Sequence, residues 1–181
     1  KRSAVGPSTK AGGPNTLVPL GTWEPVDREP VPNILVEGIG RNAASVLKRA
    51  QVGLEFPEFD FVRRAAIDDE RWWTAEFGLA RDRSELEAER NVLRYRPVPV
   101  TIRLADGAPR RDLARLLCAA AVTRSPVTIS SSVPLPTPLT EVFGSPVPPI
   151  IVRGAVVEGD ASFLQRLGTG RTPARLRLIG G

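Results

Sequence analysis

Short apolar runs alternate with helix-like stretches in the second half of this chain. Apolar residues after Pro109 recur at i, i+3, i+4, i+7 and i+8, which predicts a helix with one buried face. Phe163, Leu164 and Leu167 indicate a second, shorter helix that Asp160 could cap. Four runs predict strands: VPVTIRL (98–104), VTIS (127–130), IIVRGAVVE (150–158) and ARLRLIG (174–180). Because strand and helix alternate, we predict an α/β fold with a Rossmann-like parallel sheet over 97–181.

The first half of the chain follows a different pattern. Residues 1–33 are rich in Gly and Pro and indicate an extended segment of loop and strand. NILVEGIGRNAASVLKRA (33–50) predicts a strand over Ile34–Val36, a glycine turn and a helix. The stretches 58–77 and 84–93 are acidic and have a helical pattern. We therefore expect residues 51–96 to form a helical connector in front of the parallel-sheet domain.

Two convincing helices are too few to cover the predicted sheet. A parallel sheet is normally covered on both faces, so one face is expected to be left for another surface. That surface is either the helical connector with Trp72 and Trp73 or another part of a larger protein. The Pro-rich stretch 132–149 is long for a connection and points the same way.

Composition excludes several kinds of chemistry. The chain has one Cys and no His, which excludes an internal disulfide, a Cys/His metal site and a nucleophile activated by His. A single thiol suits the reducing cytoplasm, and no apolar stretch has the length of a membrane-spanning helix. The net charge of +5 raises nucleic-acid binding as an alternative, but the basic residues are scattered. Residues 55–90 hold eleven acids and six bases, whereas nucleic-acid binders concentrate positive charge on one face.

Two motifs each have a functional and a structural interpretation. GIGRNA (38–43) has the spacing of a dinucleotide fingerprint and opens a predicted helix. The strand that should follow with a ribose-binding acid is replaced by EFPEFDFVRR, so a plain tight turn is the other interpretation. Cys118 lies in LLCAAAV, where a buried and inert thiol is expected because no neighbour in sequence would lower its pKa.

Aromatic and basic residues supply the remaining candidates. Trp72 and Trp73 could stack on a ligand or base, but adjacent helical residues point about 100° apart, so packing and an interface are expected. Arg94 and Arg96 flank Tyr95 and could bind an anion or pair with the acids before them. The loop from Ser3 to Gly13 could grip a carboxylate or phosphate through backbone N–H groups, or could be only a loop.

Two stretches resemble one enzyme family. KRSAVGPSTKAGGPN, at the start of the chain, resembles the late loop of the aldehyde dehydrogenase module in bacterial proline utilization A proteins. ERNVLRYRPVPV (89–100) resembles the motif that opens the C-terminal domain of the longer members. NILVEGIGRNAASVLKRA lies where the family has a strand, a glycine turn and a closing helix, and ARLRLIGG resembles the family's chain end.

The resemblance implies that this chain is the C-terminal piece of a bifunctional oxidoreductase. The family oxidises proline with FAD and then oxidises L-glutamate γ-semialdehyde to glutamate with NAD, and its catalytic Cys and cofactor-binding segments precede this stretch. The resemblance therefore implies no catalytic residue and no bound cofactor here, with Cys118 not standing in for the catalytic Cys. Residues 1–50 would end the aldehyde dehydrogenase module, with Ser3, Ala4 and Val5 as candidate substrate anchors.

The same resemblance implies a structural role for the remainder. Residues 51–96 would connect to a domain at 97–181 that supports assembly and covers the tunnel between the active sites. The implied partners are the upstream catalytic modules and further copies of the protein, in the cytoplasm. An independent nucleotide-binding domain and a nucleic-acid-binding module remain the alternatives.

Overall fold

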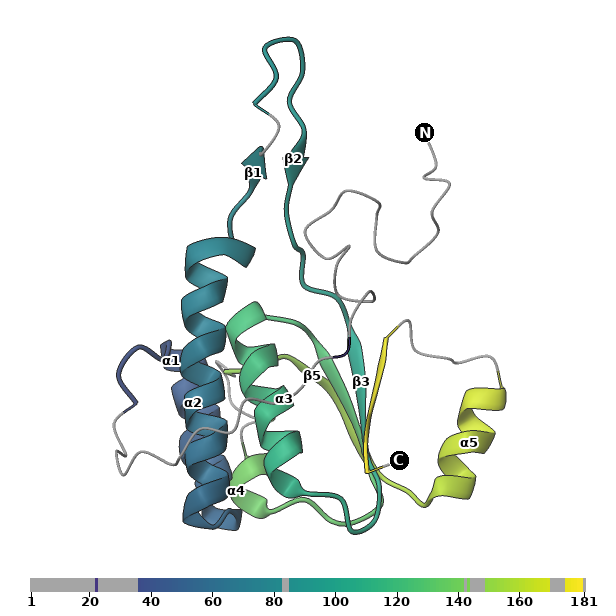
Figure 1. Cartoon of the computed structure of the whole chain (residues 1–181). Helices are drawn as coiled ribbons and strands as arrows, with labels where there is room; N and C mark the ends of the chain where they lie inside the picture. Colours follow the sequence, from purple (N-terminus) through teal and green to yellow (C-terminus); the bar gives the residue numbers. More distant parts are fainter. Residues whose placement is uncertain are drawn as a thin grey trace.

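A four-stranded sheet with helices on its two sides forms the body of the molecule (Figure 1). The computed structural model describes Thr22 and residues 36–82, 85–141, 143, 149–169 and 175–180. The helical elements are α1 (Arg41–Ala50), the 3-10 turn η2 (Gln51–Gly53), α2 (Phe56–Trp72), the π-helical turn η3 (Trp73–Phe77), α3 (Arg110–Thr123), α4 (Thr137–Thr140) and α5 (Asp160–Gly168). The strands are β1 (Arg81–Asp82), β2 (Val92–Leu93), β3 (Val100–Leu104), β4 (Val127–Ser131), β5 (Val152–Val157) and β6 (Leu176–Ile179).

The sheet is entirely parallel, as the alternation of strand and helix predicts. Its order is β5-β4-β3-β6, so the chain moves outward from β3 to β5 and then returns to pair β6 with β3. Helices α3 and α5 lie on opposite sides of the sheet (Figure 1). This arrangement is that of a doubly wound α/β sheet with a switch point between β3 and β6, and it confirms the predicted fold class.

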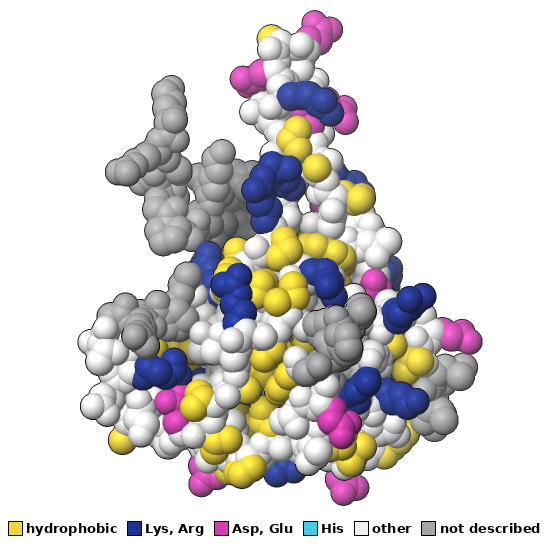
Figure 2. Space-filling view, turned by 180° about the vertical axis from the view of Figure 1, so that it is seen from behind, with side chains coloured by type: hydrophobic (Ala, Val, Ile, Leu, Met, Phe, Trp, Pro, Cys, Tyr) yellow, Lys and Arg dark blue, Asp and Glu magenta, His cyan; other side chains and the backbone are white. Residues whose placement is uncertain are grey.

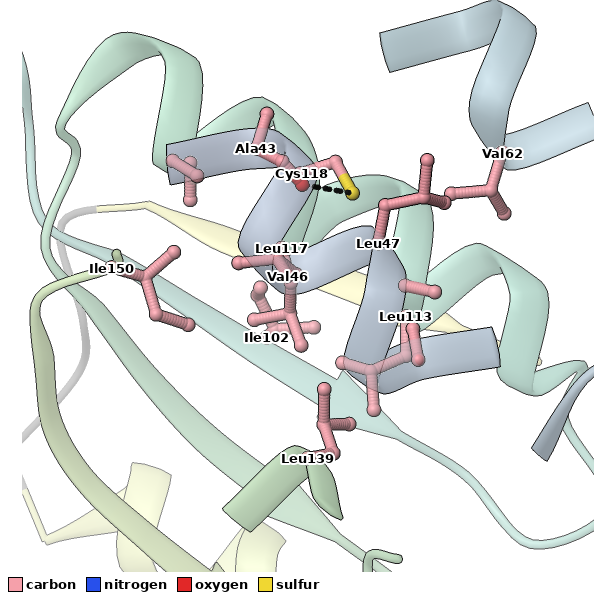
Figure 3. Close-up of a cluster of buried hydrophobic side chains, with 14 of the residues drawn as sticks. Ala43, Val46, Leu47, Val62, Ile102, Leu113, Leu117, Cys118, Leu139 and Ile150 are labelled. Atoms are coloured by element: carbon pink, nitrogen blue, oxygen red, sulfur yellow. Dashed lines mark hydrogen bonds between the residues drawn. The ribbon is translucent and has the colours of Figure 1, made fainter. Parts of the chain in front are cut away.

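The inner face of the sheet carries the hydrophobic core. Ile102 and Ile129 are paired neighbours on β3 and β4 and are almost fully buried. Val46 from α1 and Leu117 from α3 reach this face from above (Figure 3). The core side chains from α1, α2, α3 and the sheet form one cluster. The three segments that the sequence predicts, 1–50, 51–96 and 97–181, therefore share a hydrophobic core wherever the structure describes them.

Local sequence explains where the main helices begin and end. Glu55 and Glu58 form a reciprocal capping box at the start of α2, with Pro57 in the first turn. Helix α3 follows Pro109, and Arg124 ends it in the left-handed conformation with φ of 57°. None of the described helices is long and apolar enough to cross a membrane.

The outer face of the sheet is different. In register across β6, β3, β4 and β5 lie Leu178, Arg103, Ser130 and Val156. Arg103 and Ser130 are buried, whereas Leu178 is 60% exposed and Val156 is 42% exposed. The helical connector does not cover this face, because α2 packs against α3 on the other side. Helix α5 covers the centre of this face, so the face is not left free as expected, and only its margins are exposed.

A helix was predicted over 84–93, and this prediction was wrong, because residues 85–93, which the structure describes, are not helical. They belong to an arm with β1 paired to β2 that projects from the body (Figure 1). The carboxylate of Asp82 accepts hydrogen bonds from the backbone N–H groups of Glu85 and Asn91, which turns the chain back. Glu85 and Glu89 would also repel each other one helical turn apart.

Two smaller predictions need comment. Asp160 is the first residue of α5 and not its cap, since Gly159 holds the N-cap position. The carboxylate of Asp160 is instead bound by Arg103. The predicted strand at Ile34–Val36 lies mostly outside the described residues; Val36 itself precedes the turn that leads into α1.

Candidate functional site

An aromatic cleft lies where α2, α3 and the arm meet. Its volume is about 350 Å³, which is within the range of small-molecule and side-chain pockets. Trp72 is 51% exposed and Phe77 is 36% exposed at this site. The lining residues are Asp69, Trp72, Trp73, Phe77, Tyr95, Ala119, Val122 and Thr123. The structure thus brings the two tryptophans of the sequence analysis together with two further aromatic side chains.

A π-helical turn shapes one wall of the cleft. After Trp72 the helix widens into η3, and the backbone N–H of Gly78 closes this turn on the carbonyl of Trp73 at 2.7 Å. A Cβ on Gly78 would lie only 2.6 Å from that carbonyl oxygen, so the turn requires glycine. π-Helical turns are rare and frequently mark functional sites.

Tyr95 forms the opposite wall. Its ring contacts Phe77 edge to face, with 5.2 Å between ring centroids and 86° between ring planes. The phenolic oxygen is buried and has no hydrogen-bond partner among the described residues. A buried hydroxyl without a partner costs about 1–3 kcal/mol.

One ion pair forms the polar edge of the cleft. Arg115 on α3 binds Asp69 on α2 through both of its terminal nitrogens, and the Nη2 to Oδ1 distance is 2.8 Å. This bidentate pair ties the two helices together. The Asp69 side chain remains 26% exposed, so carboxylate lone pairs not used by Arg115 face solvent at the cleft.

A second polar cluster fills the outer face at the carboxyl ends of β3 and β4. The Arg103 guanidinium donates to Ser130 Oγ at 2.8 Å, Ser132 Oγ at 2.6 Å and the Glu158 carbonyl at 2.8 Å. It also binds the Asp160 carboxylate at 2.6 Å and lies 4.9 Å from the centre of the Phe163 ring. Arg103 is only 3% exposed, and its Nε has no hydrogen-bond partner in the part of the chain that the structure describes.

Glu158 extends this cluster toward α5. Its carboxylate accepts hydrogen bonds from Arg166 and from Ser130 Oγ, the latter at 2.7 Å. The Arg166 hydrogen bond holds the pKa of Glu158 below its ordinary value, and the same contact raises the pKa of Arg166. Both groups are therefore charged at neutral pH, and together with Arg103 they fasten α5 to the sheet.

The switch point of the sheet is closed by the backbone. Doubly wound folds bind ligands in the crevice beyond the carboxyl ends of the strands at this point. Here the Ala105 N–H donates to the Ile179 carbonyl at 3.0 Å. Gly180 has φ of +77°, and a Cβ on it would lie 2.5 Å from the Cβ of Ala108. The protein's own atoms thus occupy the usual ligand position.

The GIGRNA turn lies elsewhere in the fold. Gly38 adopts φ of +83°, and α1 begins at Arg41 as predicted. A Cβ on Gly40 would lie 2.7 Å from a carboxylate oxygen of Glu70, so an acidic side chain stands at this helix N-terminus. A nucleotide phosphate would meet that negative charge, and α1 follows none of the four strands of the parallel sheet. These observations favour the structural interpretation of the motif.

Cys118 is fully buried on α3, as the sequence predicts. Its Sγ lies 3.9 Å from the carbonyl oxygen of Ala43 on α1 (Figure 3). Burial raises the pKa of this thiol to about 12, so the reactive thiolate is scarce at neutral pH. The side chain acts as a small apolar group between two helices.

The other predicted residues are not part of a described site. Ser3, Ala4 and Val5 lie outside the described residues. Arg94 and Arg96 are exposed, and neither forms an ion pair within the described part of the chain, so the predicted pairing with the acidic stretch is not seen there.

Sequence reasoning missed the Arg103 cluster. Arg103 stands in the apolar run VPVTIRL, which predicts a strand with one face in the core and the other in water. This pattern alone fits an exposed Arg103 on the outer face as well as a buried one. Its burial depends on Ser130, Glu158 and Phe163, which the chain brings in 27 to 60 residues later.

Comparisons with known proteins identify no family. No protein-family model matches the chain, and no curated protein or solved structure shows significant similarity to it.

Proposed function

We propose that this chain is a non-catalytic docking piece of a larger oxidoreductase of proline catabolism, in which it covers a cavity between two active sites. The family and the reaction come from the sequence resemblance of KRSAVGPSTKAGGPN and ERNVLRYRPVPV. The docking role is supported by the outer face of the sheet, which is the single observation that carries the proposal.

That face combines rigid support with exposed apolar groups. Arg103 and its partners hold α5 in place, while Leu178 on β6 and Val156 on β5 lie on either side of the cluster and are exposed. Leu164 on α5 is 63% exposed. A docked partner would cover these three apolar side chains together with the rigid cluster between them.

The back of the molecule adds to this picture. Figure 2 shows hydrophobic side chains gathered over the middle of the body, with Lys and Arg side chains around them. The projecting arm also carries exposed apolar residues, among them Leu86 and Val92. An isolated two-stranded hairpin is at best marginally stable in water, so a docked surface would stabilise it.

The positions that would serve chemistry in this fold are taken by internal contacts. The switch point is closed by Gly180 against Ala108, the carboxyl ends of β3 and β4 are filled by the Arg103 cluster, and Cys118 is buried. These contacts favour a structural role over a nucleotide-binding role.

The coupled reaction of the longer enzyme tests the proposal. Leu178→Asp with Val156→Asp would place charges on the outer face without entering the core. We expect a lag in glutamate formation from proline, because the aldehyde intermediate would escape, while each half-reaction keeps its rate with its own substrate.

Val52→Asp is the matched control, since Val52 is 70% exposed on η2, away from the sheet. A double variant that is folded, keeps its oligomeric state and starts without a lag would contradict the lid role. Removing residues 97–181 is the poorer test, because it would also expose core residues of α1 and α2.

A further inference from the structure

The aromatic cleft has the properties of a site for a cation. Among the described residues that line it, Asp69 is the charged one; its carboxylate is paired with Arg115 and stays partly exposed. Aromatic rings present a negative face to a ligand, and a cation over such a face is attracted by about 0.5–2 kcal/mol. The intramolecular contact of Arg71, whose guanidinium carbon lies 5.5 Å from the Trp72 ring centre, is an example beside the cleft.

Helix ends add a second negative contribution. The last turns of α2–η3 and α3 lie at the same end of the molecule, beneath the arm (Figure 1). Trp72 and Phe77 enter the cleft from the first, and Val122 and Thr123 from the second. The C-terminal end of a helix carries a partial negative charge that favours cations. Arg81 already uses one such end, since it donates to the Ala75 carbonyl at 2.6 Å.

The free hydrogen-bonding capacity of the cleft is that of the Asp69 carboxylate, which keeps lone pairs beyond those that Arg115 uses. A ligand rich in N–H donors would satisfy these lone pairs. An anion would instead meet the negative ends of two helices beside the Asp69–Arg115 pair, which argues against phosphate or a nucleotide at Trp72 and Trp73.

We propose that this cleft takes the guanidinium group of an arginine side chain supplied by the protein on which the chain docks. A guanidinium is planar, carries five donors and is more weakly hydrated than an ammonium, so it stacks on aromatic rings better than lysine does. The identity of the arginine's source rests on the proposed function, whereas the chemistry of the cleft does not.

The test uses the chain itself with N-acetyl-arginine amide as the probe. Its matched control is N-acetyl-citrulline amide, which has nearly the same shape and no charge. The readout is the NMR signals of the Trp72 and Trp73 indole N–H groups. We expect saturable shifts with a dissociation constant of about millimolar for the arginine probe, and at least 5-fold weaker binding of the citrulline probe.

Two variants sharpen the result. Trp72→Leu keeps an apolar side chain and removes the π face, so the arginine probe should bind about 5-fold more weakly. Phe61→Leu is the control, because Phe61 is a comparably exposed aromatic residue on α2 that lies outside the cleft and beneath Arg111. It should leave binding unchanged.

Several results would overturn the inference. Equal binding of both probes would indicate an apolar site without charge preference. Tighter binding of inorganic phosphate, NAD or a proline-rich peptide at the same indole signals would assign the cleft to another ligand class. The two proposals fail separately. If the arginine probe binds but the Leu178→Asp/Val156→Asp variant of the longer enzyme shows no lag in glutamate formation, the lid role is refuted and the cation site stands.

Discussion

The two faces of the parallel sheet are buried by different kinds of contact. The inner face buries Ile102, Ile129 and Leu104 under α1 and α3, and its stability comes from apolar packing. The outer face buries Arg103 under α5 in a set of hydrogen bonds and leaves Leu178 and Val156 exposed at its margins. The centre of the first face is covered within this chain, although Val157 at its β5 edge is exposed. The second face presents a rigid surface with apolar groups at both margins still facing water.

The comparison separates stability from docking. Substitutions on the inner face should lower the free energy of unfolding and affect docking only through that loss of stability. Substitutions at the margins of the outer face should weaken docking and leave the free energy of unfolding nearly unchanged. The Arg103 cluster lies between the two, since it orders the outer surface without itself being exposed.

The largest effect is expected from the inner face. Leu117→Ala removes a fully buried side chain between α3, α1 and the sheet. The lost burial and the resulting cavity should lower the free energy of unfolding by about 2–5 kcal/mol, measured by urea denaturation. A change below 1 kcal/mol would mean that the two helices are not packed on the sheet as described.

The next effect concerns the outer cluster. Arg103→Met keeps a long side chain but removes the hydrogen bonds to Ser130, Ser132 and Asp160. We expect a loss of about 2–4 kcal/mol, since hydrogen bonds to charged groups are worth about 1.5–3 kcal/mol each and partly replace one another. Hydrogen exchange should rise in α5 and stay unchanged in α1. Uniform exchange across both helices would show that α5 is not held by this cluster.

A backbone substitution tests the closed switch point. Gly180→Ala should lower the free energy of unfolding by about 1–3 kcal/mol, because φ of +77° is strained for alanine and the new Cβ would press on Ala108. Gly107→Ala is a useful comparison, since Gly107 also has positive φ but no neighbour within 4 Å. Equal losses for the two variants would mean that the contact with Ala108 contributes nothing.

A pH dependence follows from Glu158. Its pKa is lowered in the folded state, whereas an unfolded Glu titrates near 4.3. The carboxylate therefore contributes stability that is fully present above about pH 5 and is lost as the pH falls through the folded pKa. Glu158→Gln should reduce the stability difference between pH 6 and pH 3. Parallel pH curves for the two proteins would refute this role.

The sequence predicts those elements whose burial follows a local pattern of apolar residues. The strands and α3 were predictable because apolar residues repeat with period 2 or 3.6 over several residues. The arm was not, because acids in a helical pattern were overridden by the Asp82 hydrogen bonds and by repulsion between Glu85 and Glu89. The aromatic cleft was half predictable: Trp72 and Trp73 stand out in sequence, but Tyr95 and Val122 join them only through folding.

The smallest effect on stability is expected at the surfaces that should matter most for docking. Leu178→Asp and Leu164→Ala each alter a side chain that is at least 60% exposed, so the free energy of unfolding should change by no more than about 0.5 kcal/mol. Thermal unfolding of each variant beside the unaltered chain checks this. A large loss at either position would make these residues part of the core and remove the distinction between the two faces.

Hydroxyl-radical footprinting tests the docking role most directly. It compares this chain alone with the same chain inside the longer enzyme of which we propose that it is a piece. The account predicts that oxidation of Trp72, Leu164 and Leu178 falls several-fold in the longer enzyme, while buried Leu117 stays unreactive in both. Equal oxidation of the three exposed residues in the two proteins would show that these surfaces remain open, and would contradict the docking role.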